Sequence, residues 1–316
     1  MWFLERYLNI IGLMQVGKRI LVFVVYFGEF PNYFDLTLDS MKRNGEIDWL
    51  FVTDQNIDDI PSNVKLNRIS FEKFREFVQA SFDFQISLND PYKICDFRPA
   101  FGKIFRDTLG DYDFWGHCDL DVIFGNILES IPARAWTFDK ILIKGALGFY
   151  RNTKRTNELY AVDHADTLDS RKAFSSEENL YFDEWHGVIQ KFLREGIQFW
   201  NDDTVYFDID KNSFRIKTVD HMRIRPKFVP DGKILMFDKL LDEQVQGAYI
   251  HLQKRRMFFS KTMIKYEPYE IRFNHFVGFG HNYFRIDYMI IGAFHFLYLR
   301  FRALKKRYLQ SLLKNR

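Results

Sequence analysis

Two carboxylates separated by one residue form the pattern in this chain that most directly suggests chemistry. Asp119 and Asp121 lie in Phe114-Trp-Gly-His-Cys-Asp-Leu-Asp-Val-Ile-Phe-Gly125, which predicts an apolar strand ending in the two acids and then a glycine turn. Side chains two apart on a strand share a face about 6.6 Å apart, so both carboxylates could bind one hard divalent cation. The apolar and aromatic neighbours favour a metal site over a solvated turn, which is the usual setting of such a pair.

A histidine and a basic turn, late in the chain, could complete this metal site. Gly247-Ala-Tyr-Ile-His-Leu252 predicts a strand, and Gln253-Lys-Arg-Arg256 follows it. Imidazole beside two carboxylates suits a cation such as Mn²⁺, with Mg²⁺ as the alternative ion. We therefore expect His251 to be the third ligand and Lys254 to bind a diphosphate. A purely structural histidine is the alternative interpretation.

A short charged segment precedes the acidic pair. Lys93, Asp96 and Arg98 lie in Pro91-Tyr-Lys-Ile-Cys-Asp-Phe-Arg-Pro-Ala-Phe-Gly102. We expect these three side chains to contact a nucleotide and its attached sugar. The alternative is an ordinary surface cluster of ion pairs, which contributes little to stability.

Residues at the ends of the first two predicted strands are candidates for nucleotide binding. Asp54 ends the second strand and could accept a hydrogen bond from a base or ribose, because ligands bind at the carboxyl ends of strands in open α/β sheets. Phe27 and Gly28 end the first strand and begin the loop after it. Phe27 could stack on the base, although a core position suits it equally.

Two adjacent acids between aromatic residues are the candidates for catalysis. Asp183 and Glu184 occur in Tyr-Phe-Asp-Glu-Trp. Either carboxylate could orient an acceptor hydroxyl, or act as a base if the reaction inverts the sugar. A pair of charges at a helix start, favoured by the helix dipole, explains them equally well.

Strands and helices alternate in the first part of the chain, which predicts an α/β fold with a mostly parallel sheet flanked by helices. Arg19-Ile-Leu-Val-Phe-Val-Val-Tyr-Phe27 is apolar on both faces, as expected for a buried parallel strand. Further strands are predicted at residues 48–54, within 60–69, as a pair in 140–150, and at 204–208, 214–219 and 247–252. Helices are predicted at residues 33–44, 71–80, 100–109, 157–168 and 183–195.

Composition limits the class of protein. The chain has 316 residues, 47% of them hydrophobic, which supports a large packed core and argues against general disorder. A formal net charge of +3 is too small to indicate nucleic acid as a partner. Cys95 and Cys118 lie in apolar segments and are expected to be reduced thiols. Without an evident linker, we expect one catalytic domain at residues 1–282 and a tail at 283–316.

The tail changes character. From Ile290 to Tyr308 apolar residues can share one helical stripe, and residues 288–316 contain no acid. This pattern predicts a basic amphipathic helix on an anionic membrane surface, and a helix docked on the catalytic domain is the alternative. Met1 to Gln15 lacks the features of a signal peptide, and no apolar run is long enough to span a bilayer. We therefore expect a cytoplasmic protein with peripheral membrane contact through its tail.

Several longer motifs, in order along residues 20 to 257, resemble a family of bacterial glycosyltransferase-like proteins found with capsular and O-antigen polysaccharide genes. The motifs are YFGEFPNYFDLTLDSMKRN, IDWLFVTD, PYKICDFRPAFGKIF, YDFWGHCDLDVIFGNI, GFYRNT, YFDEW and YIHLQKRRM. The resemblance implies a GT-A fold, which is Rossmann-like, with a nucleotide-sugar donor and a metal. By the same likeness Asp119 and Asp121 match the family's Asp-x-Asp motif, and His251 with Lys254 matches its late histidine and basic turn.

The expected function is metal-dependent transfer of a hexose from a nucleotide-diphosphate donor, typically UDP-linked, to a growing, lipid-linked bacterial polysaccharide. A nucleotidyltransferase acting on sugar phosphates also uses paired carboxylates on an α/β sheet. Such an enzyme usually has a glycine-rich basic signature after its first strand, and FGEFPNYF contains none. A non-catalytic protein of the same fold is the third alternative, although Asp119, Asp121, His251 and Lys254 argue against it.

Overall fold

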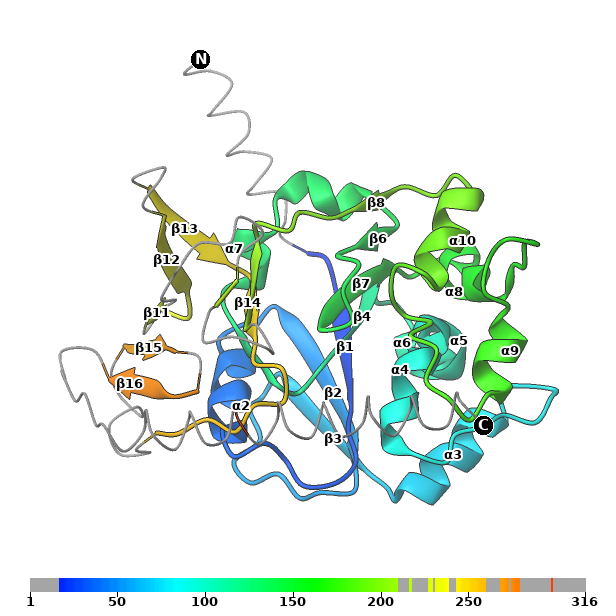
Figure 1. Cartoon of the computed structure of the whole chain (residues 1–316), viewed down its shortest axis with the longest axis horizontal. Helices are drawn as coiled ribbons and strands as arrows, with labels where there is room; N and C mark the ends of the chain where they lie inside the picture. The colour runs from blue at the N-terminus through cyan, green and yellow to red at the C-terminus, as the bar shows by residue number, and fades with distance from the viewer. Residues whose placement is uncertain are drawn as a thin grey trace, which may run out of the picture.

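A large twisted sheet forms the centre of the molecule (Figure 1). The computed structural model describes residues 17–209, 216–217, 227–229, 231–238, 243–259, 268–272, 274–278 and 297. The sheet contains, in spatial order, β3 (Val64–Arg68), β2 (Ile47–Thr53), β1 (Ile20–Val25), β4 (Phe114–Cys118), β7 (Leu147–Arg151), β6 (Lys140–Ile141) and β8 (Phe199–Trp200). The first four strands and the pair β6–β8 are parallel, whereas β7 is antiparallel to both of its neighbours. The expected α/β fold with a mostly parallel sheet is confirmed.

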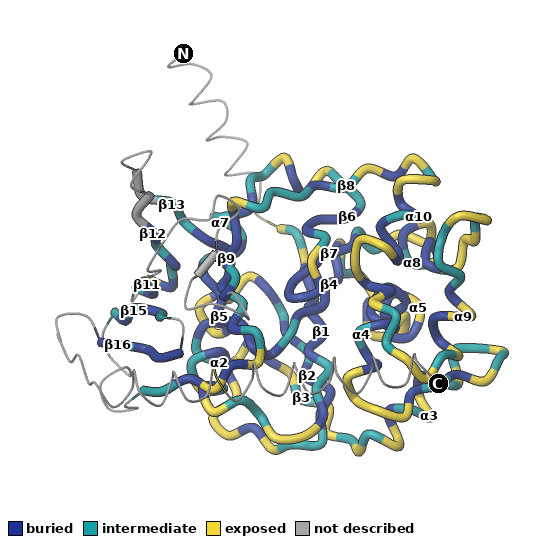
Figure 2. The backbone as a smooth tube through the Cα atoms, in the orientation of Figure 1, coloured by how far each residue is buried: buried dark blue, intermediate teal, exposed yellow. Residues whose placement is uncertain are grey.

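The side chains of strand β1 are buried on both faces of this sheet. Its branched and aromatic side chains alternate between two cores, as strand geometry requires. Ile20 and Val22 pack with helix α2 (Phe34–Lys42) on one face. Leu21 and Phe23 pack on the other face against the aromatic side chains of the helices there. Figure 2 shows the central strands buried and the outer loops exposed.

The helices on the second face are short. They are α3 (Phe71–Gln79), α4 (Ile94–Phe97), α5 (Phe101–Ile104), α6 (Arg106–Leu109), α8 (Lys154–Glu158), α9 (Ser170–Ser175) and α10 (Val188–Arg194). Three-residue 3₁₀ turns at Pro91–Lys93, Arg98–Ala100 and Leu159–Ala161 connect or extend several of them. On the first face lie α7 (Ile127–Ser130) and the 3₁₀ helix Ala133–Thr137.

Three predicted helices differ from the structure. The helix at 100–109 is broken near Phe105, whose backbone lies outside the helical region. The helix at 157–168 is wrong, because the structure has α8, a 3₁₀ turn and then irregular chain. The helix at 183–195 begins only at Val188, since residues before it form a turn in which the Gly187 N–H donates to Glu184 O.

Two smaller sheets complete the described part. One contains β10 (Ile216–Lys217), β9 (Tyr206–Ile209), β14 (Tyr249–His251) and β5 (Val122–Phe124). The other contains β13 (Glu243–Gly247), β12 (Ile234–Asp238), β11 (Lys227–Phe228), β15 (Tyr269–Ile271) and β16 (Phe276–Gly278). A third core lies between these two sheets and includes Ile123, Phe207 and Ile250.

Gly125 is needed where the two halves of the chain meet. A Cβ atom at this position would lie 2.2 Å from the Gly247 carbonyl oxygen, so only glycine fits. The predicted tail at 283–316 and the start of the chain lie outside the described residues, apart from Leu297. Within the described residues, no helix combines the length and the hydropathy that crossing a bilayer demands.

Candidate functional site

Asp119 and Asp121 lie in the connection between two sheets. Strand β4 of the large sheet ends at Cys118, and β5 of a different sheet begins at Val122. The Asp119 N–H donates to Ala146 O at 3.0 Å, and Asp121 O accepts from the Leu252 N–H at 2.7 Å. The sequence predicts that the two acids share one face of a strand. In the structure neither acid belongs to a strand, because both lie between β4 and β5. The chain instead presents them at the switch between the sheets, with each backbone fixed.

Strand β14 brings His251 to these acids from far along the chain. β14 pairs antiparallel with β5, and His251 lies opposite Val122. His251 Nε2 is 3.2 Å from Asp121 Oδ2 and 3.7 Å from Asp119 Oδ2. One ligand atom from each of the three residues lies within 4.8 Å of the others. Two carboxylates and an imidazole are a suitable donor set for Mn²⁺ or Mg²⁺.

No pattern in the sequence indicated Asp208, which faces the ring nitrogen of His251 on the side away from Asp121. Asp208 lies on β9 directly beside His251, with its Oδ1 3.4 Å from His251 Nδ1. Gln253 Nε2 also donates to this oxygen, at 2.5 Å. Burial alone lowers the pKa of His251, but its interactions with Asp121 and Asp208 raise that pKa to about 10. A carboxylate on the second ring nitrogen is the usual way to orient a metal-binding histidine.

A tight turn after β14 holds the second carboxylate. Gln253 and Lys254 both have left-handed backbones, with φ of 57° and 54°. This turn directs the Lys254 N–H to the Asp121 carboxylate, which accepts a short hydrogen bond from it. Burial opposes the charge on Asp121, yet the interactions with His251 and Lys254 lower its pKa. Asp121 is thus held as the anion that a cation requires.

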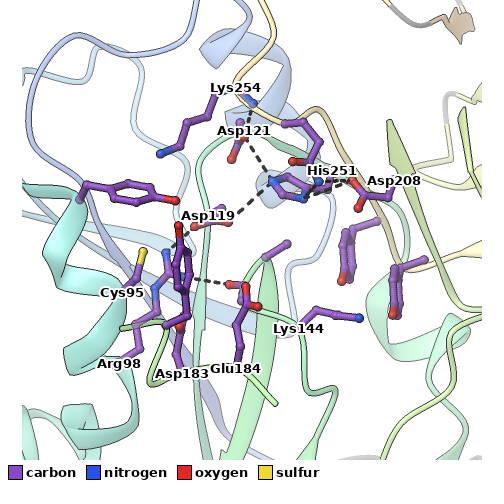
Figure 3. Close-up of a pocket in the computed structure, with 17 residues that line it drawn as sticks. Cys95, Arg98, Asp119, Asp121, Lys144, Asp183, Glu184, Asp208, His251 and Lys254 are labelled. Atoms are coloured by element: carbon purple, nitrogen blue, oxygen red, sulfur yellow. Dashed lines mark hydrogen bonds and ion pairs between the residues drawn. The ribbon is translucent and has the colours of Figure 1, made fainter. Parts of the chain in front are cut away.

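Arg98 joins the first carboxylate to the predicted catalytic acids. Its guanidinium forms a short ion pair with Asp119 and a second pair with Asp183 Oδ2 at 3.0 Å. The same group donates to Gly145 O at 3.0 Å. Burial raises the pKa of Asp183 to about 7, although Arg98 opposes the shift. Figure 3 shows Arg98 between Asp119 and the pair Asp183–Glu184.

Two cavities meet at these residues. The larger cavity, of about 540 Å³, is lined by the segment from Val24 to Tyr33, without Gly28, and by the basic residues Lys254, Arg255 and Arg256. The smaller cavity, of about 350 Å³, includes Glu184 and Asp208. Six residues line both cavities and form their shared wall: Tyr92, Cys95, Arg98, Asp119, Asp121 and Lys254.

The predicted nucleotide-binding residues near β1 separate into two groups. Phe27 lines the larger cavity and also packs against Phe71 and Phe74, with ring centroids 5.3 and 5.2 Å away. Gly28 and Asp54 line neither cavity. The Gly28 N–H donates to Asp54 Oδ1 at 3.1 Å, so Asp54 holds the start of the loop whose later residues line the larger cavity.

Lys93 and Asp96 also lie away from both cavities. Their ion pair of 2.6 Å is buried, with side-chain exposures of 3% and 0%. The alternative interpretation of these residues as a surface cluster of ion pairs is therefore wrong for Lys93 and Asp96. Lys93 Nζ donates to Ala173 O at 2.8 Å, and the Asp96 carboxylate accepts from the backbone of the loop before Asp183. Among the three charged residues of this segment, the structure brings only Arg98 to the cavities.

Several cavity residues carried no clear signal in the sequence. Lys144, Tyr181, Tyr206 and Tyr249 line the smaller cavity. Tyr206 and Tyr249 lie opposite each other on parallel neighbouring strands, and their rings stack with centroids 5.2 Å apart. Alternation along residues 204–208 could have indicated that Tyr206 and Asp208 share a face, but not which strand lies beside them. Cys95 and Cys118 are both free thiols, as expected.

Comparison with known proteins gives one family. A search of curated proteins found no match. The model of a family described as "Family of unknown function (DUF6625)" matches residues 22–279, which include both cavities and every residue named above as a candidate metal ligand. This match covers most of the chain, so the protein belongs to the DUF6625 family.

Proposed function

We propose that this protein is a metal-dependent glycosyltransferase with a GT-A type of fold. It transfers a sugar from a nucleotide-diphosphate donor, with a UDP-hexose as the expected donor, to a growing polysaccharide. The observation that carries the proposal is the position of Asp119, Asp121 and His251. Their potential ligand atoms cluster within 4.8 Å, and both acids belong to the wall between the two cavities. A diphosphate at that wall would connect a nucleotide in one cavity to a sugar in the other.

The larger cavity suits the nucleotide. Apolar and aromatic side chains from Val24 to Tyr33 offer contact surface for a flat base. Lys254 and Arg256 also line this cavity, and both side chains are exposed. Cations there would pair with the phosphate oxygens that a metal leaves unmatched.

The smaller cavity suits sugar chemistry. A bound divalent cation supplies charge stabilisation for the departing diphosphate. Asp183 is buried and held by Arg98, so its role is to fix the guanidinium beside Asp119. Glu184 is exposed and also lines the cavity, which makes it the better placed carboxylate to accept a proton from an acceptor hydroxyl.

Calorimetry of UDP binding, with and without Mn²⁺, tests the site. We expect binding to be strengthened by Mn²⁺ in the full chain and this gain to vanish in Asp121→Asn. Equal UDP affinity in both conditions would contradict the metal assignment. Release of UDP from a panel of UDP-sugars then tests the reaction, whereas release of pyrophosphate from UTP and a sugar phosphate would indicate a nucleotidyltransferase.

The acceptor and the membrane belong to the same proposal. A lipid-linked acceptor keeps its sugar end at the cytoplasmic membrane face, where the basic stripe predicted in residues 288–316 would bind. Co-sedimentation with anionic liposomes, comparing the full chain with one ending at Asp287, tests this part. Equal sedimentation of the two chains would contradict it.

A further inference from the structure

Tyr181 has a backbone conformation that a bulky residue rarely adopts. Its φ is 54°, in the left-handed region, where a non-glycine residue costs about 1–3 kcal/mol. Its side chain is nevertheless 51% exposed and lines the smaller cavity. The ring is thus only half buried, and hydrogen bonds to the backbone on both sides of Tyr181 help to hold this conformation.

The buried Lys93–Asp96 pair helps to hold this conformation. The Asp96 carboxylate accepts the Leu180 N–H at 2.9 Å and the Phe182 N–H at 2.7 Å, the two amides on either side of Tyr181. Lys93 Nζ neutralises this carboxylate and donates to Glu178 O as well. A fully buried ion pair thus holds the chain on both sides of one exposed aromatic residue.

Tyr181 lies beside groups that suit a carbohydrate. Tyr92 also lines the cavity and is 45% exposed, with Lys254 Nζ 3.9 Å from its ring centroid. An aromatic face carries partial negative charge and offers rigid apolar area, which complements the C–H face of a pyranose ring. Glu184, Asp208 and Lys144 supply hydrogen-bonding groups for the hydroxyls of such a ring.

The smaller cavity presents charged groups of both signs. Its carboxylates are Asp119, Asp121, Asp183, Glu184 and Asp208. Arg98, Lys144 and Lys254 are cations, and interactions with Asp121 and Asp208 raise the pKa of His251 to about 10, which adds a fourth positive charge. Hydrogen-bond donors and acceptors are therefore both available to the hydroxyls of a pyranose ring.

We infer that Tyr181 is the binding platform for a pyranose ring of the acceptor glycan, and that Lys93 and Asp96 are the positioning residues that present it. Because the ring is half exposed, the rest of a glycan chain can continue into solvent from the platform. The acceptor role of this glycan rests on the proposed function, but binding of the sugar does not.

Saturation-transfer NMR on the full chain tests this inference without nucleotide or metal. The probes are the methyl glycosides of glucose and galactose. We expect transfer to at least one of them. Tyr181→Gly should reduce this signal about 5- to 10-fold, the loss of one aromatic stacking contact. Tyr181→Phe should retain it.

The thermal midpoint separates binding from folding in this experiment. Tyr181→Gly should unfold at the same or a higher temperature than the natural protein, because glycine adopts a positive φ without strain. Phe77→Ala, which removes another exposed aromatic side chain outside the cavity linings, should bind the glycosides normally.

Two results would overturn the inference: no transfer to either glycoside, or an unchanged signal in Tyr181→Gly. If UDP still binds in a Mn²⁺-dependent manner in either of these cases, the proposed function stands and only the platform fails. If glycoside binding depends on Tyr181 but UDP does not bind, the platform stands and the proposed transferase reaction fails.

Discussion

The two cavities are built from different chemistry. One segment, Val24 to Tyr33 without Gly28, forms much of the larger cavity and supplies mainly apolar and aromatic side chains. The smaller cavity is assembled from short pieces of six segments and is rich in carboxylates and tyrosines. The shared wall, by contrast, brings the buried side chains of Arg98 and Asp121 together with Asp119 and Lys254. Changes in that wall should therefore damage both cavities, whereas changes on one side should be separable.

Arg98 in the shared wall should give the largest effect. Arg98→Met leaves the Asp119 and Asp183 carboxylates without their cation, and removing one partner of a buried ion pair typically costs about 3–5 kcal/mol. Urea unfolding should show this loss in the free energy of unfolding. Arg106→Met, at an 82% exposed side chain, is the matched control and should leave stability nearly unchanged. A loss in Arg98→Met no greater than in the control would show that the guanidinium is not essential to the wall.

Asp121, also in the shared wall, should affect activity more than stability. Asp121→Asn keeps the shape of the side chain but removes a charge from the candidate metal site. Loss of one such contact to developing charge costs roughly 10²–10³ in rate. The measurement is UDP release from the active UDP-sugar, with Asp107→Asn on the exposed surface of α6 as control. A rate within threefold or so of the natural protein would contradict the assignment.

Asp208 lines only the smaller cavity, so a change there tests whether the two cavities act independently. Asp208→Asn removes the carboxylate behind His251 and should weaken Mn²⁺ binding about 10- to 100-fold. Binding of UDP without metal should remain unchanged, because Asp208 does not line the larger cavity. Titration calorimetry measures both. If metal-free UDP binding weakens as much as Mn²⁺ binding, the two cavities do not act separately.

Asp54, behind the loop of the larger cavity, should give the smallest effect. Burial raises its pKa, but hydrogen bonds from Gln55 and the Gly28 N–H outweigh this and lower the pKa from 3.8. A lowered folded-state pKa means stability that is present above 3.8 and lost as the pH falls through the folded value. Since the carboxylate is partly exposed, Asp54→Asn should cost less than about 1 kcal/mol at pH 7.

The same variant should cost less at pH 3 than at pH 7, because the advantage of the ionised carboxylate is lost as the pH falls toward and through its lowered folded-state pKa. Unfolding curves at the two pH values provide the check, with Asp58→Asn on the exposed part of the following loop as control. A cost that does not change between pH 7 and pH 3 would argue that the Gly28–Asp54 bond contributes little.

Local sequence was sufficient for much of the fold. The apolar run at β1 predicts a strand buried on both faces, and the structure confirms it. Helix α3 follows Ser70, whose side chain accepts the Lys73 N–H, and its limits agree with the prediction within one residue. The prediction of a helix at 157–168 was wrong. Apolar residues there have helical spacing, but backbone groups of this segment form hydrogen bonds to other parts of the protein. Val162, for example, uses its carbonyl oxygen to accept from Lys191.

The candidate site depends on contacts that no local pattern contains. Acidic residues at 119 and 121 were evident, but the sheet switch between them and Asp208 behind His251 follow from which strands pair. Lys93 and Asp96 carry the charges of a surface segment, and only the tertiary structure shows them buried beneath a loop more than eighty residues later. Pairing between distant strands and burial of charged side chains are therefore the features of this site that the sequence alone does not predict.

The turn that fixes Asp121 also has a consequence for how the protein folds. Lys254 and Asp121 are 133 residues apart, and β14 must insert between β5 and β9 before their hydrogen bond can form. Closing a loop of that length is entropically costly and comes late. All strands of the large sheet precede residue 201, so that sheet can assemble on a growing chain before β14 is synthesised. During that interval the acidic pair lacks its histidine, so the candidate metal site stays incomplete until β14 has been synthesised.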